Sequence, residues 1–385
     1  MKNFVFNTTP CIEFGMGSLQ KIGEIIFSKK IQSVLIVTDP GIISTNIITE
    51  TTNILDSFGI KSSVFSEVKA DPPEKVIFDC TNQSIKNKAE MIVGIGGGSS
   101  LDVAKLVSVL SIEKEKLNNL YGIGNVDGPR LPLILIPTTA GTGSEVTAVS
   151  IVTTGISEKK GVVSPIIIPD IAILDPSLTI GLPPHITAAT GIDAMVHAIE
   201  AYSSINENNN LISKSLAVKA LNLMGVSIEK AVKNGSNIEA RSNMLLGSMF
   251  AGQAFANSPV AGVHALAYPL GGHYKVPHGL SNSLVLPHVL RFNAVTCSNV
   301  YAEIAPHIFP EIAMSSSQEM TQLLINNLEK LSERCGLEQK LRQVGVEKES
   351  LPFLAKEAMK QTRLLVNNPR KINVEDALNI YEAAW

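Results

Sequence analysis

Four residues with metal-binding side chains form two pairs in the second half of the chain. Asp193 and His197 are four residues apart in GIDAMVHAIEAY, a spacing that places both side chains on one face of a helix, about one turn apart. His264 and His278 begin and end HALAYPLGGHYKVPH. Two glycines and a proline inside that stretch are expected to interrupt regular structure and to turn the chain back toward the first pair.

Three neutral imidazoles and one carboxylate suit Fe(II), Zn(II) or another divalent first-row metal better than Mg²⁺ or Ca²⁺, which prefer oxygen ligands. Either pair alone also fits an ordinary surface ion pair with scattered core histidines. Both pairs lie in apolar sequence rich in small residues, which favours the metal site. All seven histidines come after residue 184, so the metal chemistry is expected in the second half of the chain.

Length and composition limit the class of protein. A chain of 385 residues exceeds one usual hydrophobic core, and 45% hydrophobic against 17% charged residues excludes disorder. A net charge of -3 without blocks of like charge argues against nucleic acid or a membrane surface as a partner. The four cysteines form no C-x-x-C motif. Because we find no signal peptide and no long apolar run, we expect a soluble cytoplasmic protein.

The first half alternates short β-branched runs with helical stretches. Residues 33–38, 91–95, 131–137 and 171–175 are nearly continuous apolar runs, typical of buried parallel strands. Helices are expected between them at 19–27, 47–58 and 101–110. This order predicts an open, mostly parallel α/β sheet, whose ligands bind at the carboxyl ends of the strands.

Two strand ends carry sequences suited to phosphate binding. MIVGIGGGSSLDVAKLV leads from a strand through glycines into a helix, where free backbone N–H groups can bind a pyrophosphate; a purely structural turn fits equally well. PTTAGTGSEVT follows the next strand and offers a second cradle of glycines and hydroxyls, although a surface turn is the alternative. The candidate cofactor contacts in these two segments are Gly96, Gly97, Gly98, Ser99, Thr138, Thr139, Thr142 and Ser144.

Asp39 ends the first of the predicted strands. A carboxylate there could accept hydrogen bonds from a ribose and repel a 2′-phosphate, which favours NAD over NADP. An Asp-Pro-Gly turn is the alternative. The usual dinucleotide fingerprint places its acidic residue about 20 residues after the glycines, whereas Asp39 precedes them. G-x-G-x-x-G and the P-loop motif are both absent, which indicates a nucleotide site of a different lineage.

The strand signal stops after GLPP at 181–184, and amphipathic helical stretches follow. We therefore predict an α/β nucleotide-binding domain over residues 1–182 and an all-α metal-binding domain over residues 183–385. The predicted helices cover 188–203, 212–232, 238–257, 278–292, 318–335, 351–362 and 374–384.

Taken in order, GGGSSLDVAK, PTTAGTGSEVT, LPPHITAATGIDAMVHAIEAY and AGQAFANSPVAGVHALAYPLGGHYKVPHG resemble the iron-containing (group III) alcohol dehydrogenases. The resemblance covers essentially the whole chain. It implies a dehydroquinate synthase-like fold, with an NAD(P)-binding α/β domain, an all-helical domain, and metal and substrate in the cleft between them. It also implies a homodimer.

The resemblance assigns roles to individual residues. It implies that Fe(II), with Zn or another divalent metal as the alternative, is held by Asp193, His197, His264 and His278. Lys159 corresponds to a lysine that reaches the nicotinamide ribose. The positions that match the dinucleotide contacts of the family are Asp39, Gly97, Gly98, Ser99, Thr138 and Thr139.

One position departs from the family pattern. Many members have a second histidine four residues after the one that matches His264, and this chain has Tyr268. A tyrosine with an ordinary pKa of about 10 is a poor base at neutral pH, so we interpret Tyr268 as a packing residue. Tyr268 and His273 are the candidates for any proton transfer. Phe255 is a candidate wall of an apolar substrate pocket, or a core residue.

The expected function is hydride transfer between NAD(H) and a small alcohol, aldehyde or ketone, with the metal acting as a Lewis acid. The residues beside the ligands are apolar, which favours a small neutral substrate. Three alternatives stay open: a polyol dehydrogenase, a dehydroquinate synthase-like lyase, and a catalytically silent metal- or nucleotide-binding protein. A lyase would need several basic residues around a carboxylated substrate.

Overall fold

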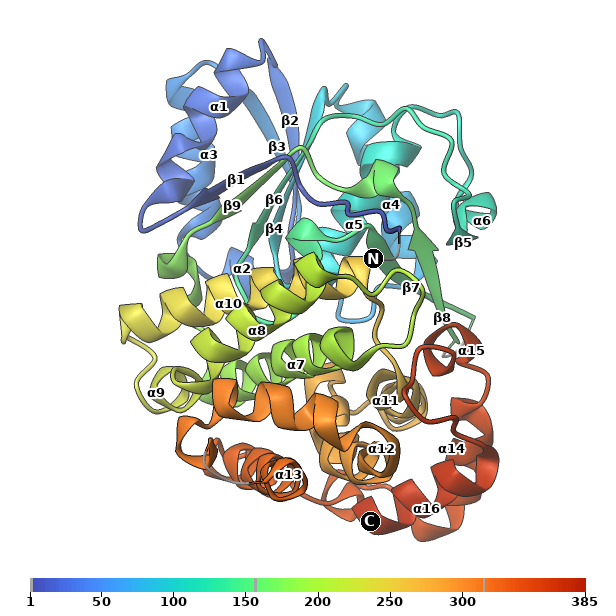
Figure 1. Cartoon of the computed structure of the whole chain (residues 1–385). Helices are drawn as coiled ribbons and strands as arrows, with labels where there is room; N and C mark the ends of the chain where they lie inside the picture. Colours follow the sequence, from blue (N-terminus) through green and yellow to red (C-terminus); the bar gives the residue numbers. More distant parts are fainter. Residues whose placement is uncertain (1–2, 156–157, 314–315) are drawn as a thin grey trace. The chain divides into compact units, whose positions relative to one another are not determined.

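The computed structural model describes residues 3–155, 158–313 and 316–385. The chain forms two compact units (Figure 1). The α/β unit comprises residues 7–139 and 144–181, and the helical unit comprises 182–385 with the segment 140–143 and the chain up to Phe6. The division into domains predicted from the sequence, at residues 182 and 183, stays a prediction.

The α/β unit is built on a parallel sheet of six strands. The four strands expected from apolar runs are present, and the structure adds one at each edge. In spatial order they are β1 (Cys11–Phe14), β9 (Ile171–Leu174), β6 (Leu133–Pro137), β4 (Met91–Gly96), β2 (Ser33–Val37) and β3 (Lys61–Phe65). Each neighbouring pair is parallel, which confirms the predicted class of sheet.

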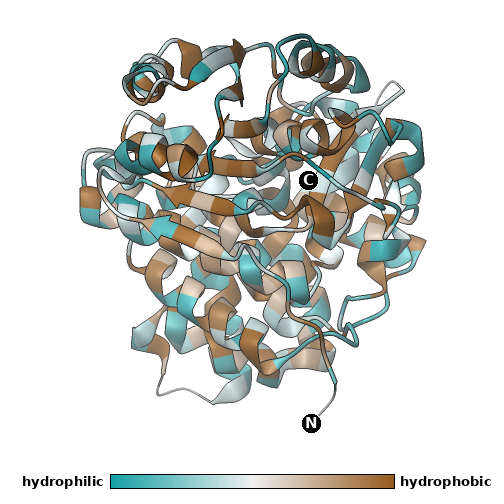
Figure 2. Ribbon diagram, turned by 90° about the horizontal axis from the view of Figure 1, so that it is seen from above, coloured by the Kyte–Doolittle hydropathy of each residue, from teal (hydrophilic) through white to brown (hydrophobic). Residues whose placement is uncertain are grey.

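Helices cover both faces of this sheet, with α1 (Ile22–Ser28) and α3 (Ile47–Ser57) on one face and α4 (Glu74–Lys86) and α5 (Gly98–Leu110) on the other (Figure 1). Alternate residues of each strand point to opposite faces. Leu35 and Ile92 therefore join the core under α4 and α5, while Ile36 and Val93 join the core under α1 and α3. Burial on both faces explains the continuous apolar runs, which colour the strands largely brown in Figure 2.

A smaller sheet completes the α/β unit. Its central strand, β8 (Glu158–Val163), pairs antiparallel with β7 (Val149–Thr154) and parallel with β5 (Gly122–Ile123). The apolar-run signal missed β7 and β8 because their burial alternates or is partial, and it missed β5 because both of its residues are exposed. The remaining short helices of this unit are α2 (Pro40–Ile43) and α6 (Leu117–Leu120).

In the helical unit, no strand occurs within the described ranges. Its centre is α7 (Pro184–Ser203), which starts with a proline at its first position, a placement that helices favour, and packs against α8, α10 and α12. Throughout the described residues, helices fall short of the length or apolarity that crossing a membrane requires. The other helices are α8 (Leu211–Gly225), α9 (Ile228–Lys233), α10 (Ile238–Asn257), α11 (Gly262–Tyr274), α12 (His278–Ile308), α13 (Ser317–Arg334), α14 (Leu351–Ala358), α15 (Thr362–Leu365) and α16 (Val374–Ala384).

Three predicted helix boundaries are wrong. The helix expected over 212–232 is split after Gly225, where the backbone of Ile308 packs so closely that a Cβ would lie 2.8 Å from its carbonyl oxygen. The helix expected to end at 292 continues to Ile308 across a kink at Cys297. The helix expected over 351–362 stops at Ala358, and α15 follows separately.

Candidate metal centre

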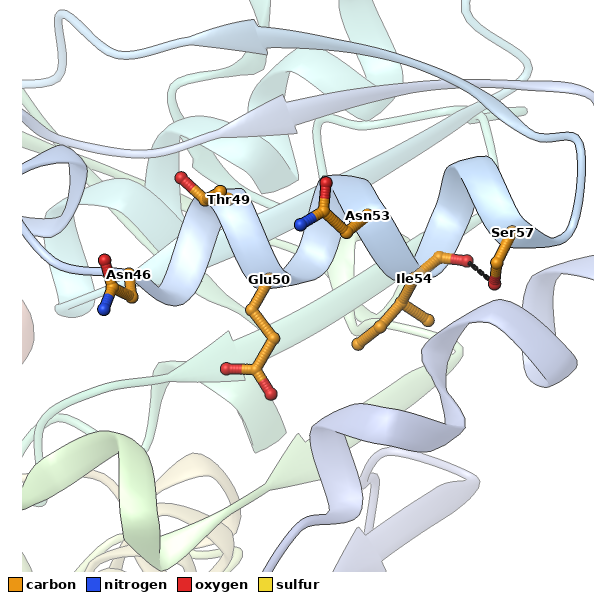
Figure 3. Close-up of a pocket in the computed structure, with 6 residues that line it drawn as sticks. All are labelled: Asn46, Thr49, Glu50, Asn53, Ile54 and Ser57. Carbon is orange, nitrogen blue, oxygen red and sulfur yellow. Dashed lines mark hydrogen bonds between the residues drawn. The ribbon is translucent and has the colours of Figure 1, made fainter.

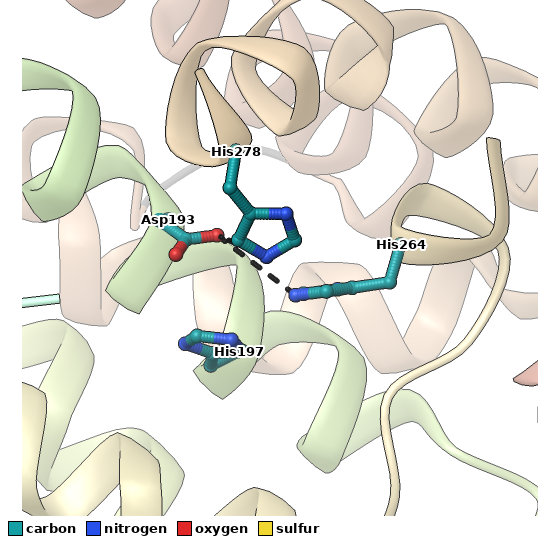
Figure 4. A group of neighbouring side chains, drawn as sticks. All are labelled: Asp193, His197, His264 and His278. Carbon is teal, nitrogen blue, oxygen red and sulfur yellow. Dashed lines mark ion pairs between the residues drawn. The ribbon is translucent and has the colours of Figure 1, made fainter. Parts of the chain in front are cut away.

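Three helices of the helical unit supply the four side chains singled out in the sequence. Asp193 and His197 project from one face of α7, His264 comes from α11, and His278 is the first residue of α12 (Figure 4). One ligand atom from each residue lies within 4.8 Å of the others. Residues from two distant stretches of sequence thus meet at one point, with one carboxylate and three imidazoles.

The segment between His264 and His278 was expected to be interrupted by its glycines and proline, but the structure differs. Helix α11 continues through Pro269 and both glycines to Tyr274. The reversal occurs at Lys275, which adopts a left-handed conformation with φ 58°. Helix α12 then approaches α7 so closely that a Cβ on Gly279 would lie 2.3 Å from the carbonyl oxygen of Ala189. A glycine is therefore required for His278 to reach Asp193.

Burial and neighbouring groups together set the charge of Asp193 and His197. Burial alone would raise the pKa of Asp193, but the imidazoles of His278, His197 and His264 and a hydrogen bond from Asn282 outweigh it and lower that pKa. Burial lowers the pKa of His197 to about 3. At neutral pH the site therefore combines a carboxylate with a neutral imidazole, the protonation states that metal binding requires.

Hydrogen bonds to groups outside the four-residue cluster orient two of the imidazoles. His264 Nδ1 lies 2.6 Å from Glu200 Oε2, and the other Glu200 oxygen accepts the N–H of Val263 at 2.6 Å. His197 Nδ1 lies 3.2 Å from the carbonyl oxygen of Gly141. Each contact places the proton on Nδ1 and leaves the Nε2 lone pair for the centre of the site. Sequence reasoning missed Glu200, although it follows His197 by three residues on the same helix face.

Asn282 also reaches the centre from one turn beyond His278, and the sequence analysis missed it. Its Nδ2 lies 2.6 Å from Asp193 Oδ1 and 3.3 Å from Nε2 of both His264 and His278. Ligand atoms of Asp193, His264 and His278 thus surround a positively polarised NH₂ group. The ligand atoms of the four clustered residues are three nitrogens and one oxygen with one formal negative charge in total, and such a set fits a divalent first-row metal.

Two aromatic residues flank the ligands. Phe255 stacks on His197, with ring centroids 4.4 Å apart. The Tyr268 ring lies 5.9 Å from the His278 ring. His273, a candidate for proton transfer, lies outside the four-residue cluster and has its Nε2 3.9 Å from a carboxylate oxygen of Glu357.

Within the α/β unit, several predicted cofactor residues gather at the carboxyl ends of β2, β4 and β6. Asp39 caps α2, and its second oxygen accepts the hydroxyl of Ser100 at 3.1 Å. Gly96 has φ 151°, and a Cβ there would lie 3.0 Å from Asp39 Oδ2. The N–H of Thr138 donates to the carbonyl of Gly96 at 3.0 Å. A Cβ on Gly97 would meet the Thr139 methyl at 3.5 Å.

The remaining predicted cofactor residues have diverse surroundings. Gly98 and Ser99 form the first turn of α5, where backbone N–H groups have no intrahelical partner. The Ser144 hydroxyl donates to Asp102 at 2.6 Å, and Lys159 forms an ion pair with Asp71. Thr142 belongs to the segment 140–143, grouped with the helical unit. Their roles toward a dinucleotide stay predictions.

The glycines of that segment do structural work within the helical unit. Gly143 has φ 58°, and a Cβ there would lie 2.5 Å from the Cα of Gly252 on α10. Gly141 supplies the carbonyl that contacts His197. These two glycines therefore position the segment against α10 and the ligand imidazole. Interpreting the sequence as a flexible or phosphate-binding loop does not predict these contacts.

A surface hollow along α3 offers no comparable chemistry. Figure 3 shows its six lining residues, all from α3 and its N-cap, with Glu50 as the single ionisable group among them (Figure 3). Glu50 is moreover hydrogen-bonded to Gln20. A reaction that needs several ionisable groups therefore fits the four-residue cluster better than the hollow along α3.

Comparison with known families agrees with this site. The model described as "Iron-containing alcohol dehydrogenase" matches residues 10–176, and the one described as "Fe-containing alcohol dehydrogenase family, C-terminal" matches residues 187–385. The chain belongs to the iron-containing alcohol dehydrogenase family. The four clustered residues form the metal site typical of that family, and the chain is an oxidoreductase acting on alcohols or aldehydes.

Relatives match this family member along its whole length. It is 37% identical to long-chain-alcohol dehydrogenase 1 of Geobacillus thermodenitrificans, over 98% of this chain and 95% of the relative. It is 32% identical to NAD-dependent methanol dehydrogenase of Bacillus methanolicus, over 100% of each chain. A crystal structure of 1,3-propanediol oxidoreductase superposes with a TM-score of 0.96 at 33% identity, covering 100% of both chains.

Proposed function

We propose that this chain transfers a hydride between NAD(H) and a small alcohol or aldehyde, and that Asp193, His197, His264 and His278 hold Fe(II) or another divalent metal for this reaction. The convergence of their ligand atoms within 4.8 Å carries the proposal. A metal bound there would supply a Lewis acid that polarises the substrate's oxygen.

The protein's own residues prepare that site. Glu200 and the Gly141 carbonyl fix the orientation of two imidazoles, so the lone pairs point inward before any metal arrives. Phe255 covers one face of His197 and keeps water from that side. These contacts reduce the reorganisation that metal and substrate binding require.

For the cofactor, we propose NAD rather than NADP. Asp39 presents a carboxylate beside Gly96 at the end of β2, where it would accept hydrogen bonds from a ribose and repel a 2′-phosphate. Backbone N–H groups in the first turn of α5, at Gly98 and Ser99, would bind the pyrophosphate. The similarity to the NAD-dependent methanol dehydrogenase of Bacillus methanolicus supports this choice. The homodimer and the cytoplasmic location stay predictions.

The direct test compares metal-free and Fe(II)-reconstituted protein in an NADH absorbance assay with a panel of aldehydes. Turnover should need the metal. Substituting His264→Ala should abolish both metal binding and turnover while leaving NAD affinity nearly unchanged. His307→Ala, on α12 outside the cluster, is the control and should keep both. Full turnover after complete metal depletion would refute the proposal, and a silent protein would show none under any condition.

A further inference from the structure

An arginine contacts a tyrosine whose ring lies beside His278 of the metal centre. The His278 side chain is 42% exposed, whereas those of Asp193 and His264 are 3% exposed. A substrate would therefore reach the centre past His278. The Tyr268 ring centroid lies 5.9 Å from that of His278, and the Tyr268 hydroxyl oxygen accepts a hydrogen bond from Arg363 Nη2 at 3.4 Å.

The charge of Arg363 is not neutralised by an acid. Across the described part of the chain, no carboxylate oxygen lies within 4.0 Å of its guanidinium, whereas Arg334 pairs with Glu229. The acid on the neighbouring helix α14, Glu357, is engaged by Lys360. Arg363 is thus an available cation, and its guanidinium is hydrogen-bonded to a neutral phenol.

The backbone that carries Arg363 is firmly held. It lies in α15, which packs against α11, and the following residue, Leu364, is buried. The buried amide of Asn367 donates to the carbonyls of both Arg363 and Val260, each at 3.0 Å. A guanidinium presented from a fixed backbone loses less freedom when it binds a ligand.

These groups suit an oxyanion. A guanidinium binds carboxylate or sulfonate oxygens through two parallel N–H donors. The Tyr268 oxygen accepts a hydrogen bond from Arg363, and among the described residues none accepts the Tyr268 O–H, which can therefore donate to the same anion.

Building on the proposed dehydrogenase function, we propose that Arg363 and Tyr268 bind an anionic group on the substrate, so that this chain favours short aldehydes and alcohols that carry a carboxylate or sulfonate. The metal centre would take the carbonyl or hydroxyl end, and Arg363 the anionic end. This differs from the neutral substrate expected from the apolar residues beside the ligands, because Arg363 comes from a segment about a hundred residues further along the chain.

The test compares kcat/KM of the Fe(II)-loaded enzyme with NADH for 4-oxobutanoate, 2-sulfoacetaldehyde and butanal. At least one anionic aldehyde should exceed butanal by about tenfold or more, and the better of the two identifies the group. Arg363→Met should lower kcat/KM for that anion roughly 10- to 100-fold and leave butanal within about twofold. Arg363→Lys should recover part of the loss.

Two further variants separate local recognition from other effects. Tyr268→Phe should lower kcat/KM for the preferred anion several-fold with little effect on butanal. Lys330→Met removes an exposed positive charge on α13, and it should change nothing if the effect is local rather than long-range attraction. Equal losses for anion and butanal in Arg363→Met, or no loss, would overturn the inference.

A binding measurement keeps the inference testable without turnover. Calorimetry with butanoate and propane-1-sulfonate should show weaker binding of at least one anion to Arg363→Met than to the unaltered holoenzyme. If no aldehyde is reduced, the proposed function fails, but anion binding that depends on Arg363 still supports the recognition site. Equal binding by both proteins would overturn it.

Discussion

Replacing Glu200 by glutamine should weaken metal binding without touching a ligand. Glu200 accepts two hydrogen bonds of 2.6 Å, from His264 Nδ1 and from the N–H of Val263, and it is buried. A glutamine has one acceptor oxygen in place of two. Either its NH₂ group faces the Val263 N–H, or it faces His264 and favours the tautomer that protonates Nε2. Both arrangements disturb the ligand imidazole.

Loss of such an outer hydrogen bond typically costs 10- to 100-fold in metal affinity, which corresponds to about 1.4–2.8 kcal/mol. The assay is competition for Fe(II) or Zn(II) against a chelator of known affinity. Glu207→Gln, at an exposed position outside the centre, is the matched control. Thermal unfolding of the metal-free proteins shows whether the fold is intact. Equal metal affinity of Glu200→Gln and the control would refute the role assigned to Glu200.

Three other outcomes follow from the structure. Gly143→Ala should lower the free energy of unfolding by roughly 1–3 kcal/mol in denaturant titrations. Gly336→Ala, also at positive φ but with no atom within 4 Å of a Cβ, should lower it by less. Equal losses in the two variants would contradict the close packing of Gly143. Burial lowers the pKa of His288 to about 4, so this histidine binds a proton in the unfolded chain at a higher pH than in the folded one. The free energy of unfolding should therefore fall by up to about 1.4 kcal/mol per pH unit between pH 6.5 and 4. His288→Phe should flatten that slope, and an unchanged slope would contradict the lowered pKa of His288. Asp39→Asn should raise kcat/KM with NADP relative to kcat/KM with NAD by about tenfold, because asparagine keeps the oxygen that caps α2 and loses the negative charge. An unchanged ratio would show that Asp39 does not determine the choice of cofactor.

Local patterns predicted much of the fold and of the centre. The buried strands were visible because both faces of the parallel sheet are covered, which makes their sequences continuously apolar. The spacing of Asp193 and His197 indicated one helix face, and the structure places both on α7. These features depend on neighbouring residues, so a single sequence contains them.

Features that depend on contacts between distant segments could not be predicted in this way. Pro269 and two glycines suggested broken structure, yet burial and packing hold α11 together to Tyr274. Gly141 and Gly143 resembled a phosphate-binding loop, but within the helical unit they contact His197 and α10. Arg363 gave no signal in the sequence because only the packing of α15 against α11 brings it beside Tyr268.

Asp193 and the three histidines are central to this account as holders of one divalent ion. Anomalous diffraction from crystals loaded with Fe(II) or Zn(II) tests this most directly. The predicted result is a single strong peak bonded to Asp193, His197, His264 and His278, at about 2.0–2.2 Å for Zn(II). A peak elsewhere, or one that leaves any of the four residues unbonded, would contradict the proposed centre.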